Sequence, residues 1–175
     1  MPFAINASRR ILEVLPAERI LRICFEWNGC GNEQLVQRAG ELALESGGNM
    51  KFDLKCGSPI LSLALSGSDN SSAFANFRAT YEKFYNDRRD LPVLTATTLM
   101  VSGYTDAEEV EQISSFIAKI DPSIPYSLLV FAPHHMMNDL PTTPIAQVKE
   151  CYNAARRHLK RVNIGNLNLL SRSPM

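Results

Sequence analysis

An acidic and a basic residue, Asp53 and Lys55, stand two positions apart at the end of an apolar run with strand character. Side chains two residues apart on a strand point to the same face. On an inward face these two groups form either a structural ion pair or two contacts to one ligand, and the pair alone leaves both interpretations open. A lysine beside carboxylates suits a zwitterionic ligand, because its ammonium group binds a carboxylate.

A second acidic residue favours the ligand interpretation. Glu26 ends an earlier apolar run and is followed by Trp27 and Asn28. In parallel α/β folds, ligands bind at the carboxyl ends of the strands. We therefore expect Glu26 to meet Asp53 and Lys55 at one edge of a sheet, where either carboxylate receives an amine or helps to hold a cation.

Two weaker candidates follow later runs. Gly103 comes after the run at 93–101, where glycine allows either close backbone approach to a ligand or a tight turn, and the turn is the favoured interpretation. His134 and His135 follow the run at 126–131. Adjacent histidines on a loop diverge, so we expect one of them, not both, to line a pocket, and we expect no metal site.

The elements that must position these residues alternate along the chain. Hydrophobic periodicity predicts strands over 21–26, 50–55, 93–101, 126–131 and 162–165, and helices over 8–15, 32–46, 71–86, 105–121 and onward from 143. Thr105 and Glu108 have the spacing of a capping box that opens the fourth helix. Pro144 suits the first turn of the last helix, where no backbone donor is needed.

Strands separated by helices imply parallel pairing with right-handed crossovers. The runs are nearly continuous in apolar residues, which is expected of strands covered on both faces. Periodicity does not distinguish an open doubly wound sheet from part of a barrel. With 175 residues, the chain has the length of one domain with a real core, and we expect a single domain over 1–175.

Composition excludes several classes of partner. Lys plus Arg and Asp plus Glu are both 18, so the net charge is zero and gives no basic surplus for nucleic acid. Apolar runs are too short to span a membrane, and the N-terminus lacks the apolar core of a signal peptide. The sequence therefore predicts a cytoplasmic protein.

The four cysteines match no metal-binding pattern. Cys24, Cys30, Cys56 and Cys151 are widely separated, whereas an iron–sulfur cluster normally requires several thiolates within one loop. We expect free thiols in a chain without an export signal. Cys151 lies on the apolar stripe of the last helix and is expected in the core.

Several short stretches, taken in order, resemble the radical S-adenosylmethionine (radical SAM) family, in its pyruvate formate-lyase-activating-enzyme-like branch. The resemblance runs from about Ile20 to Leu170. It is carried by the sequence FEWNG at 25–29, SGGNMKFDLK at 46–55, VSGY at 101–104, IPYSLL at 124–129, DLP at 139–141 and IGN at 164–166.

This resemblance implies a partial parallel (β/α) barrel of the radical SAM, TIM-like type, with about four to five strands. In that family, S-adenosylmethionine binds a [4Fe–4S] cluster held by a CxxxCxxC loop and is cleaved reductively to start radical chemistry. The resemblance places Glu26 and Asn28 near the cofactor, Asp53 and Lys55 at its methionyl end, and His135 close to a cofactor-contacting histidine. The candidate cofactor-binding residues are thus Glu26, Asn28, Asp53, Lys55, Gly103 and His135.

The sequence contains no CxxxCxxC motif. From this we expect the C-terminal portion of a radical SAM barrel, truncated and inactive without a cluster-bearing N-terminal part. That part would come from a separate chain, or the protein would associate with itself. Two alternatives stay open: a non-catalytic α/β module that binds a small ligand or a partner, and a remnant without activity. The substrate and the catalytic residues are not predicted.

Overall fold

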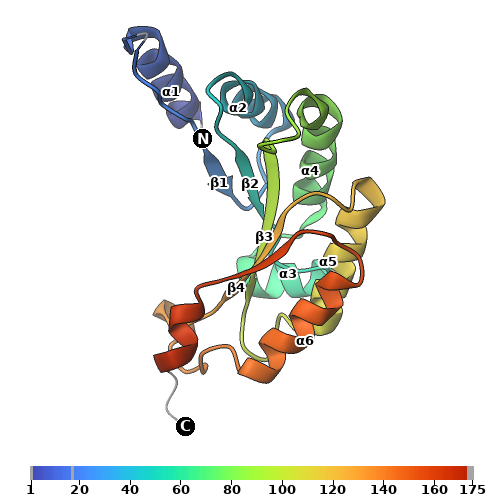
Figure 1. Cartoon of the computed structure of the whole chain (residues 1–175). Helices are drawn as coiled ribbons and strands as arrows, with labels where there is room; N and C mark the ends of the chain where they lie inside the picture. The colour runs from blue at the N-terminus through green and yellow to red at the C-terminus, as the bar shows by residue number, and fades with distance from the viewer. Residues whose placement is uncertain (1, 17, 173–175) are drawn as a thin grey trace. The chain divides into compact units, whose positions relative to one another are not determined.

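The computed structural model describes residues 2–16 and 18–172. Its strands are β1 (Phe25–Trp27), β2 (Met50–Asp53), β3 (Leu94–Met100), β4 (Tyr126–Val130) and β5 (Val162–Gly165). They form an open sheet in the order β1-β2-β3-β4-β5, with parallel registers for β1–β2, β3–β4 and β4–β5 (Figure 1). The predicted α/β class with a parallel sheet is confirmed.

The helices fill the intervals between the strands. They are α1 (Pro2–Val14), α2 (Glu33–Glu45), α3 (Pro59–Ser66), α4 (Ser71–Phe84), α5 (Ala107–Ile120) and α6 (Ile145–Arg156), with short 3₁₀ turns at Tyr85–Asp87, His135–Met137 and Leu167–Arg172. Within the described residues, no helix is long and apolar enough to cross a membrane.

Burial alternates along the strands. In β4, Tyr126, Leu128 and Val130 are fully buried, whereas the residues between them are half-exposed. In β2, Met50 and Phe52 are fully buried between half-exposed polar neighbours. This pattern is typical of a strand with one covered face. Strands β2 and β4 therefore do not meet the expectation of strands covered on both faces, whereas β3 meets it in part, since Ala96, Thr97 and Thr98 are buried in succession.

The chain divides into two compact units. One comprises residues 1–52 and 71–95, and the other comprises residues 53–70 and 96–175. The boundaries fall within β2 and β3. The single domain predicted from the length of the chain stays a prediction.

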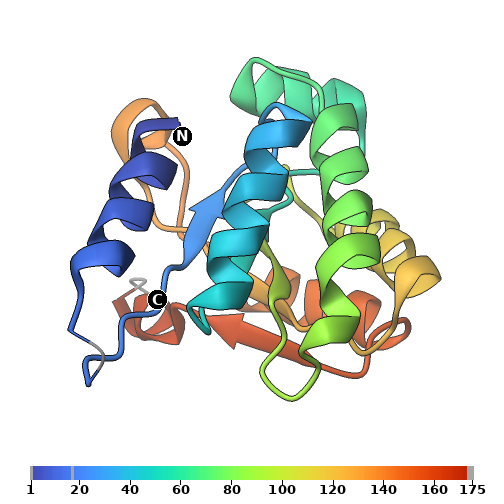
Figure 2. The same cartoon turned by 90° about the horizontal axis from the view of Figure 1, so that it is seen from above.

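In the first unit, helix α2 packs against α1 and α4 (Figure 2). Asn32 caps α2, with its side-chain oxygen accepting a hydrogen bond from the backbone nitrogen of Gln34 at 3.0 Å. A β-carbon at Gly40 would overlap the ring of Phe84, so glycine permits the close approach of α2 and α4. Helix α1 begins at Pro2, well before the predicted start at Ser8, and Ile5 is its buried anchor.

In the second unit, α5 and α6 pack side by side (Figure 1). In the same unit, a buried chain of hydrogen bonds joins strands β4 and β3 to the residue that follows β2. The Tyr126 hydroxyl donates to Thr98 Oγ1 at 2.8 Å, and Thr98 Oγ1 donates to the carbonyl oxygen of Leu54 at 2.6 Å. Burial raises the pKa of Tyr126, so its phenol stays protonated and keeps donating.

Two helix starts differ from the prediction. Asp106, not Thr105, caps α5, with its carboxylate accepting from the backbone nitrogens of Glu108 and Glu109 at 3.0 and 3.1 Å. An aspartate at this position is a strong cap because its charge also favours the helix N-terminus. Helix α6 begins one residue after Pro144, which occupies the cap position.

Helix α3 was not predicted. It is short, with eight residues, and most of its apolar side chains are exposed, so it lacks a clear hydrophobic stripe. Its local signal is nevertheless present in the sequence. Ser58 caps the helix, and Pro59 occupies the first turn, which is a known start pattern.

Candidate ligand-binding site

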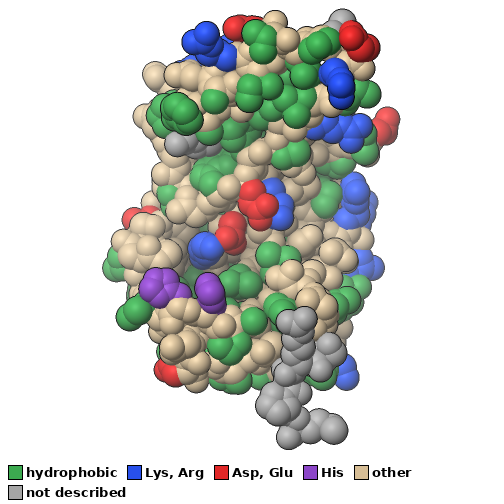
Figure 3. Space-filling model, turned by 90° about the vertical axis from the view of Figure 1, so that its left-hand side faces the viewer, with side chains coloured by type: hydrophobic (Ala, Val, Ile, Leu, Met, Phe, Trp, Pro, Cys, Tyr) green, Lys and Arg blue, Asp and Glu red, His purple; other side chains and the backbone are tan. Residues whose placement is uncertain are grey.

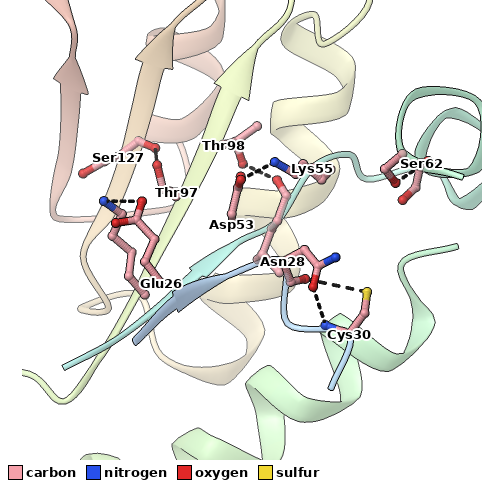
Figure 4. A network of polar contacts seen from close by, with 12 residues as sticks. Glu26, Asn28, Cys30, Asp53, Lys55, Ser62, Thr97, Thr98 and Ser127 are labelled. Atoms are coloured by element: carbon pink, nitrogen blue, oxygen red, sulfur yellow. Dashed lines mark hydrogen bonds and ion pairs between the residues drawn. The ribbon is translucent and has the colours of Figure 1, made fainter. Parts of the chain in front are cut away.

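The structure pairs Asp53 with Lys55. The Lys55 Nζ donates to Asp53 Oδ2, and both side chains come from the end of β2 (Figure 4). Their exposed fractions are 23% for Asp53 and 37% for Lys55. Asp53 Oδ1, by contrast, is buried and has no hydrogen-bond partner among the described residues. A buried acceptor without a donor costs about 1–3 kcal/mol. The Asp53 carboxylate therefore has one acceptor that the described residues leave unsatisfied.

The turn after Lys55 is fixed at both of its ends. The Glu109 carboxylate accepts from the backbone nitrogens of Gly57 and Ser58 at 2.6 and 2.9 Å. The buried Asn70 amide donates to the carbonyl oxygens of Cys56 and Gly57 at 2.8 and 3.0 Å. These four bonds hold the backbone that follows the Asp53–Lys55 pair, and none of them is visible in the hydrophobic pattern of the sequence.

The cysteines do not form a cluster-binding loop. Cys56 and Cys151 are fully buried, and burial raises the pKa of each thiol to about 12; the Glu109 carboxylate also raises that of Cys56. Thiols at such a pKa are protonated near neutral pH, whereas cluster and metal ligation requires thiolates. Over residues 2–16 and 18–172, no group of three or more metal-binding side chains occurs. The predicted core position of Cys151 is confirmed.

A cavity of about 180 Å³ lies at the carboxyl ends of β2 and β3. Val101 and Thr105 are buried and form its floor, whereas Lys55, Ser66 and Met137 are at least partly exposed and form its rim. Leu65 and Leu99 complete the lining. We call this space the Thr105 cavity. It is mostly apolar, as small-molecule sites usually are.

Gln147 of α6 holds the loop that forms the cavity floor. Its Nε2 donates to the carbonyl oxygens of Val101 and Thr105 at 3.1 and 2.9 Å, and its Oε1 accepts from the backbone nitrogen of Gly103 at 3.2 Å. Sequence reasoning missed this residue, because a glutamine in the first turn of a helix carries no signal for a contact about 45 residues away.

Gly103 itself is in a turn. Its φ is +76°, and a β-carbon built there would meet nothing within 4 Å. The turn interpretation is therefore the better supported one, since the left-handed backbone conformation already requires glycine. His135 has a φ of +52° and is exposed, as is His134. Figure 3 shows histidine side chains (purple) at the surface of the molecule. Among the described residues, neither Gly103 nor His135 belongs to the lining of the Thr105 cavity.

The remaining two candidates, Glu26 on β1 and Asn28 just after it, belong to the first unit. Figure 4 labels both side chains. Glu26 is exposed and forms an ion pair with Lys51 on β2 at 2.8 Å. Asn28 folds its side chain over the following turn and accepts from the backbone nitrogen of Cys30 at 3.1 Å. The convergence of Glu26 and Asn28 with Asp53 and Lys55 around one ligand stays a prediction.

The turn after β1 is rigidly held within the first unit. The buried Asn76 amide donates to the carbonyl oxygens of Gly29 and Gly31, both at 2.8 Å. Gly29 has a φ of +79°, and a β-carbon there would lie 2.7 Å from the ring of Phe52. The turn that carries Asn28 thus requires glycine for both its backbone conformation and its packing.

A second cavity, of about 260 Å³, lies in the first unit and is lined by Ala4, Phe25, Glu26 and Trp27. The Trp27 ring packs on Phe52 at a centroid distance of 4.7 Å. Its Nε1 is buried without a hydrogen-bond partner among the described residues. The indole therefore covers the core.

Comparison of the chain with known proteins gives matches at the level of structure. No protein-family model and no curated protein matches the sequence. A domain of the pyruvate-formate lyase-activating enzyme from Bacteroides vulgatus ATCC 8482 superposes with a TM-score of 0.70 at 15% identity, covering 94% of this chain and 91% of that one. A radical SAM methyltransferase from Sphaerobacter thermophilus superposes with a TM-score of 0.68 at 14% identity.

The second match covers 93% of this chain but only 47% of the methyltransferase, so the chain spans about half the length of that relative. At these identities the matches establish the fold and not the activity. The shared fold agrees with the partial parallel barrel that the resemblance in the sequence implied.

Proposed function

We propose, from the fold that this chain shares with solved radical SAM proteins, that it is the S-adenosylmethionine-binding part of a radical SAM-type barrel. The observation that carries the proposal is the Asp53–Lys55 pair at the end of β2, with one carboxylate oxygen buried and without a partner among the described residues.

The two side chains match the methionyl end of S-adenosylmethionine, which bears a carboxylate and an ammonium group. The Lys55 ammonium would bind the carboxylate, and the partly exposed Asp53 carboxylate would accept a hydrogen bond from the ammonium. The proposal places Glu26, Asn28, Gly103 and His135 around the rest of the same ligand, as the family resemblance implies.

Cys56 and Cys151 do not fit a [4Fe–4S] cluster, because they are buried and protonated near neutral pH. Cys24 and Cys30 are two thiols, fewer than the three that a CxxxCxxC loop supplies. The proposal therefore assigns the cluster to cysteines outside these 175 residues, and it assigns no redox step to this chain. S-Adenosylmethionine bound to such a cluster supplies the radical chemistry. The side chains described here would bind and orient its methionyl end.

Titration of the purified chain with S-adenosylmethionine by isothermal calorimetry tests the proposal. Charge-assisted hydrogen bonds contribute about 1.5–3 kcal/mol, so Lys55→Ala should weaken binding about 10- to 100-fold. Lys83→Ala is a matched control, because Lys83 also forms a half-exposed ion pair, with Glu41 at 3.3 Å on helices α4 and α2. Equal affinities of the Lys55→Ala and Lys83→Ala variants would remove Lys55 from the site.

A non-catalytic module that binds a small ligand or a partner is the second candidate, and the buried, protonated thiols favour it. Anaerobic incubation with iron and sulfide, alone and with a polypeptide that carries a CxxxCxxC motif, separates the two. Formation of a cluster absorbance that S-adenosylmethionine perturbs supports the radical SAM proposal. Binding of S-adenosylmethionine without any cluster in either mixture supports the non-catalytic module.

A further inference from the structure

The Thr105 cavity combines apolar walls with a charged side chain at its rim. The apolar part of the lining comes from Leu65, Leu99, Val101 and Met137. Lys55 is also part of the lining, and its side chain is 37% exposed. Thr105 Oγ1 is buried, and the Ser66 hydroxyl donates to the carbonyl oxygens of Ser62 and Ser68. Among the described lining residues, the Lys55 ammonium is therefore the charged group that a ligand can reach.

Two opposite charges lie beside this cavity. Lys55 Nζ donates to Asp53 Oδ2, so the Asp53 carboxylate lies within the length of one lysine side chain of the lining (Figure 4). An ammonium group has three donors, so that of Lys55 can also bind a ligand carboxylate. The Asp53 carboxylate, whose side chain is 23% exposed, repels a second anion and attracts a cation. A ligand with both charges, such as an α-amino acid, therefore matches the pair better than a simple carboxylate does.

The size of the cavity limits the side chain of such an amino acid. An apolar cavity of about 150 Å³ holds one benzene molecule, so about 180 Å³ gives room for about six carbon atoms. Lys55, Ser66 and Met137 at the rim are at least partly exposed, whereas Val101 and Thr105 at the floor are buried. An apolar side chain can therefore enter from the rim while the charged head group stays at Lys55.

We propose that the Thr105 cavity binds the apolar side chain of a free α-amino acid, with about four to six side-chain carbon atoms. The Lys55 ammonium binds its carboxylate, and the Asp53 carboxylate attracts its ammonium group. The inference rests on the proposed function for these head-group contacts, and it adds a second class of ligand to the same site. All of these residues belong to the second unit. Because both ligands use Lys55, the amino acid competes with S-adenosylmethionine.

Titration of methyl-labelled protein with L-norleucine, followed by NMR, tests the proposal. The methyl resonances of Leu65, Leu99, Val101 and Met137 should shift together and saturate. Norleucine has three more methylene groups than L-alanine, and each buried methylene strengthens binding about fourfold, so norleucine should bind about 10- to 60-fold more tightly. L-Glutamine has a side chain of similar length with a polar end and should bind at least about tenfold more weakly than norleucine. Hexanoate, which is norleucine without its ammonium group, should bind at least about threefold more weakly.

Leu65→Ala enlarges the cavity and should change which side chain it prefers. The ratio of the affinity for L-phenylalanine to that for norleucine should rise at least about threefold. Leu63→Ala is the matched control, because Leu63 is on the same helix, α3, but is 57% exposed and is not part of the lining. It should leave the ratio within about twofold of the parent value. Lys55→Ala should weaken norleucine binding at least about tenfold.

The inference is overturned if norleucine gives no saturable shift of the four methyl groups, or if glutamine or hexanoate binds as tightly as norleucine. It is also overturned if Lys55→Ala binds norleucine as tightly as the parent, or if Leu65→Ala and Leu63→Ala give the same affinity ratio. Titration with S-adenosylmethionine separates this failure from that of the proposed function. Binding of S-adenosylmethionine without binding of norleucine overturns only the inference, whereas the reverse result overturns only the proposed function.

Discussion

The Glu109 carboxylate should stabilise the turn after Lys55 more than any other side chain on the first turn of α5. It accepts two backbone hydrogen bonds, from Gly57 at 2.6 Å and from Ser58 at 2.9 Å. Hydrogen bonds to charged groups contribute about 1.5–3 kcal/mol each. Both bonds are partly buried, so we discount the sum by about half and expect Glu109→Ala to cost about 1.5–3 kcal/mol.

The assay is thermal and urea unfolding of the variant and the parent chain. In a chain of this length, about 1 kcal/mol shifts the unfolding midpoint by about 2–4 °C, so the expected decrease is about 3–12 °C. Glu109→Gln keeps an oxygen acceptor without the charge and should fall between the parent and Glu109→Ala. It should also lower the pKa of the Cys56 thiol, because the Glu109 carboxylate is one of the charges that raise it.

Glu108→Ala is the control for this prediction. Glu108 is the exposed neighbour on the same first turn, so both variants lose the same favourable interaction of an acidic residue with the helix N-terminus. If the free energies of unfolding of Glu109→Ala and Glu108→Ala agree within about 0.5 kcal/mol, the two backbone bonds do not stabilise the turn and the reasoning is refuted.

Three further predictions concern charge, thiols and backbone. The pKa of Glu111 is lowered, mainly by its hydrogen bond with His158. In urea unfolding above pH about 4.5, Glu111→Gln should therefore lower the free energy of unfolding by about 0.5–1 kcal/mol. This difference should disappear at lower pH, where Glu111 of the parent chain becomes protonated. Ellman's reagent at pH about 8 should label the exposed Cys24 within minutes but should label the buried Cys56 only after unfolding. Gly29→Ala should destabilise the chain by about 2–4 kcal/mol in urea unfolding, because it adds strain at positive φ and a clash.

Each of these has an outcome that contradicts it. A constant penalty for Glu111→Gln from pH 7 down through the usual carboxylate range would show that the carboxylate charge is not involved. Prompt labelling of Cys56 in the folded chain would contradict its burial. Gly67 has a similar φ of +72° but open space around it. Gly67→Ala should therefore lower the free energy of unfolding only by the backbone strain of alanine at positive φ. Equal penalties for the two glycine variants would show that the ring of Phe52 does not limit the turn.

Much of the fold was predictable from local pattern. The strand at Val162–Gly165 and the helix between Asn32 and Ser46 were predicted to within a residue, because hydrophobic periodicity and capping residues act over a few positions. Helix α1 was placed too late because its one buried residue, Ile5, precedes the apparent cap at Ser8. Helix α3 was missed because its apolar side chains are mostly exposed and give no stripe.

The candidate site was predictable only in part. Two residues on one strand must point to the same face, so the sequence by itself determined that Asp53 and Lys55 would be neighbours, and the structure confirms their pairing. The order of the elements and the short family stretches likewise indicated the parallel fold, which the structural matches confirm.

Tertiary structure alone decided which polar groups remain unused. Thr105 and Asp106 are both good caps by sequence, and only the folded backbone gave the role to Asp106 and left the Thr105 hydroxyl buried without a partner among the described residues. Gln147 and Glu109 contact backbone about 40 to 50 residues away. Such contacts depend on how helices pack on strands, and periodicity over a few positions contains no information about them.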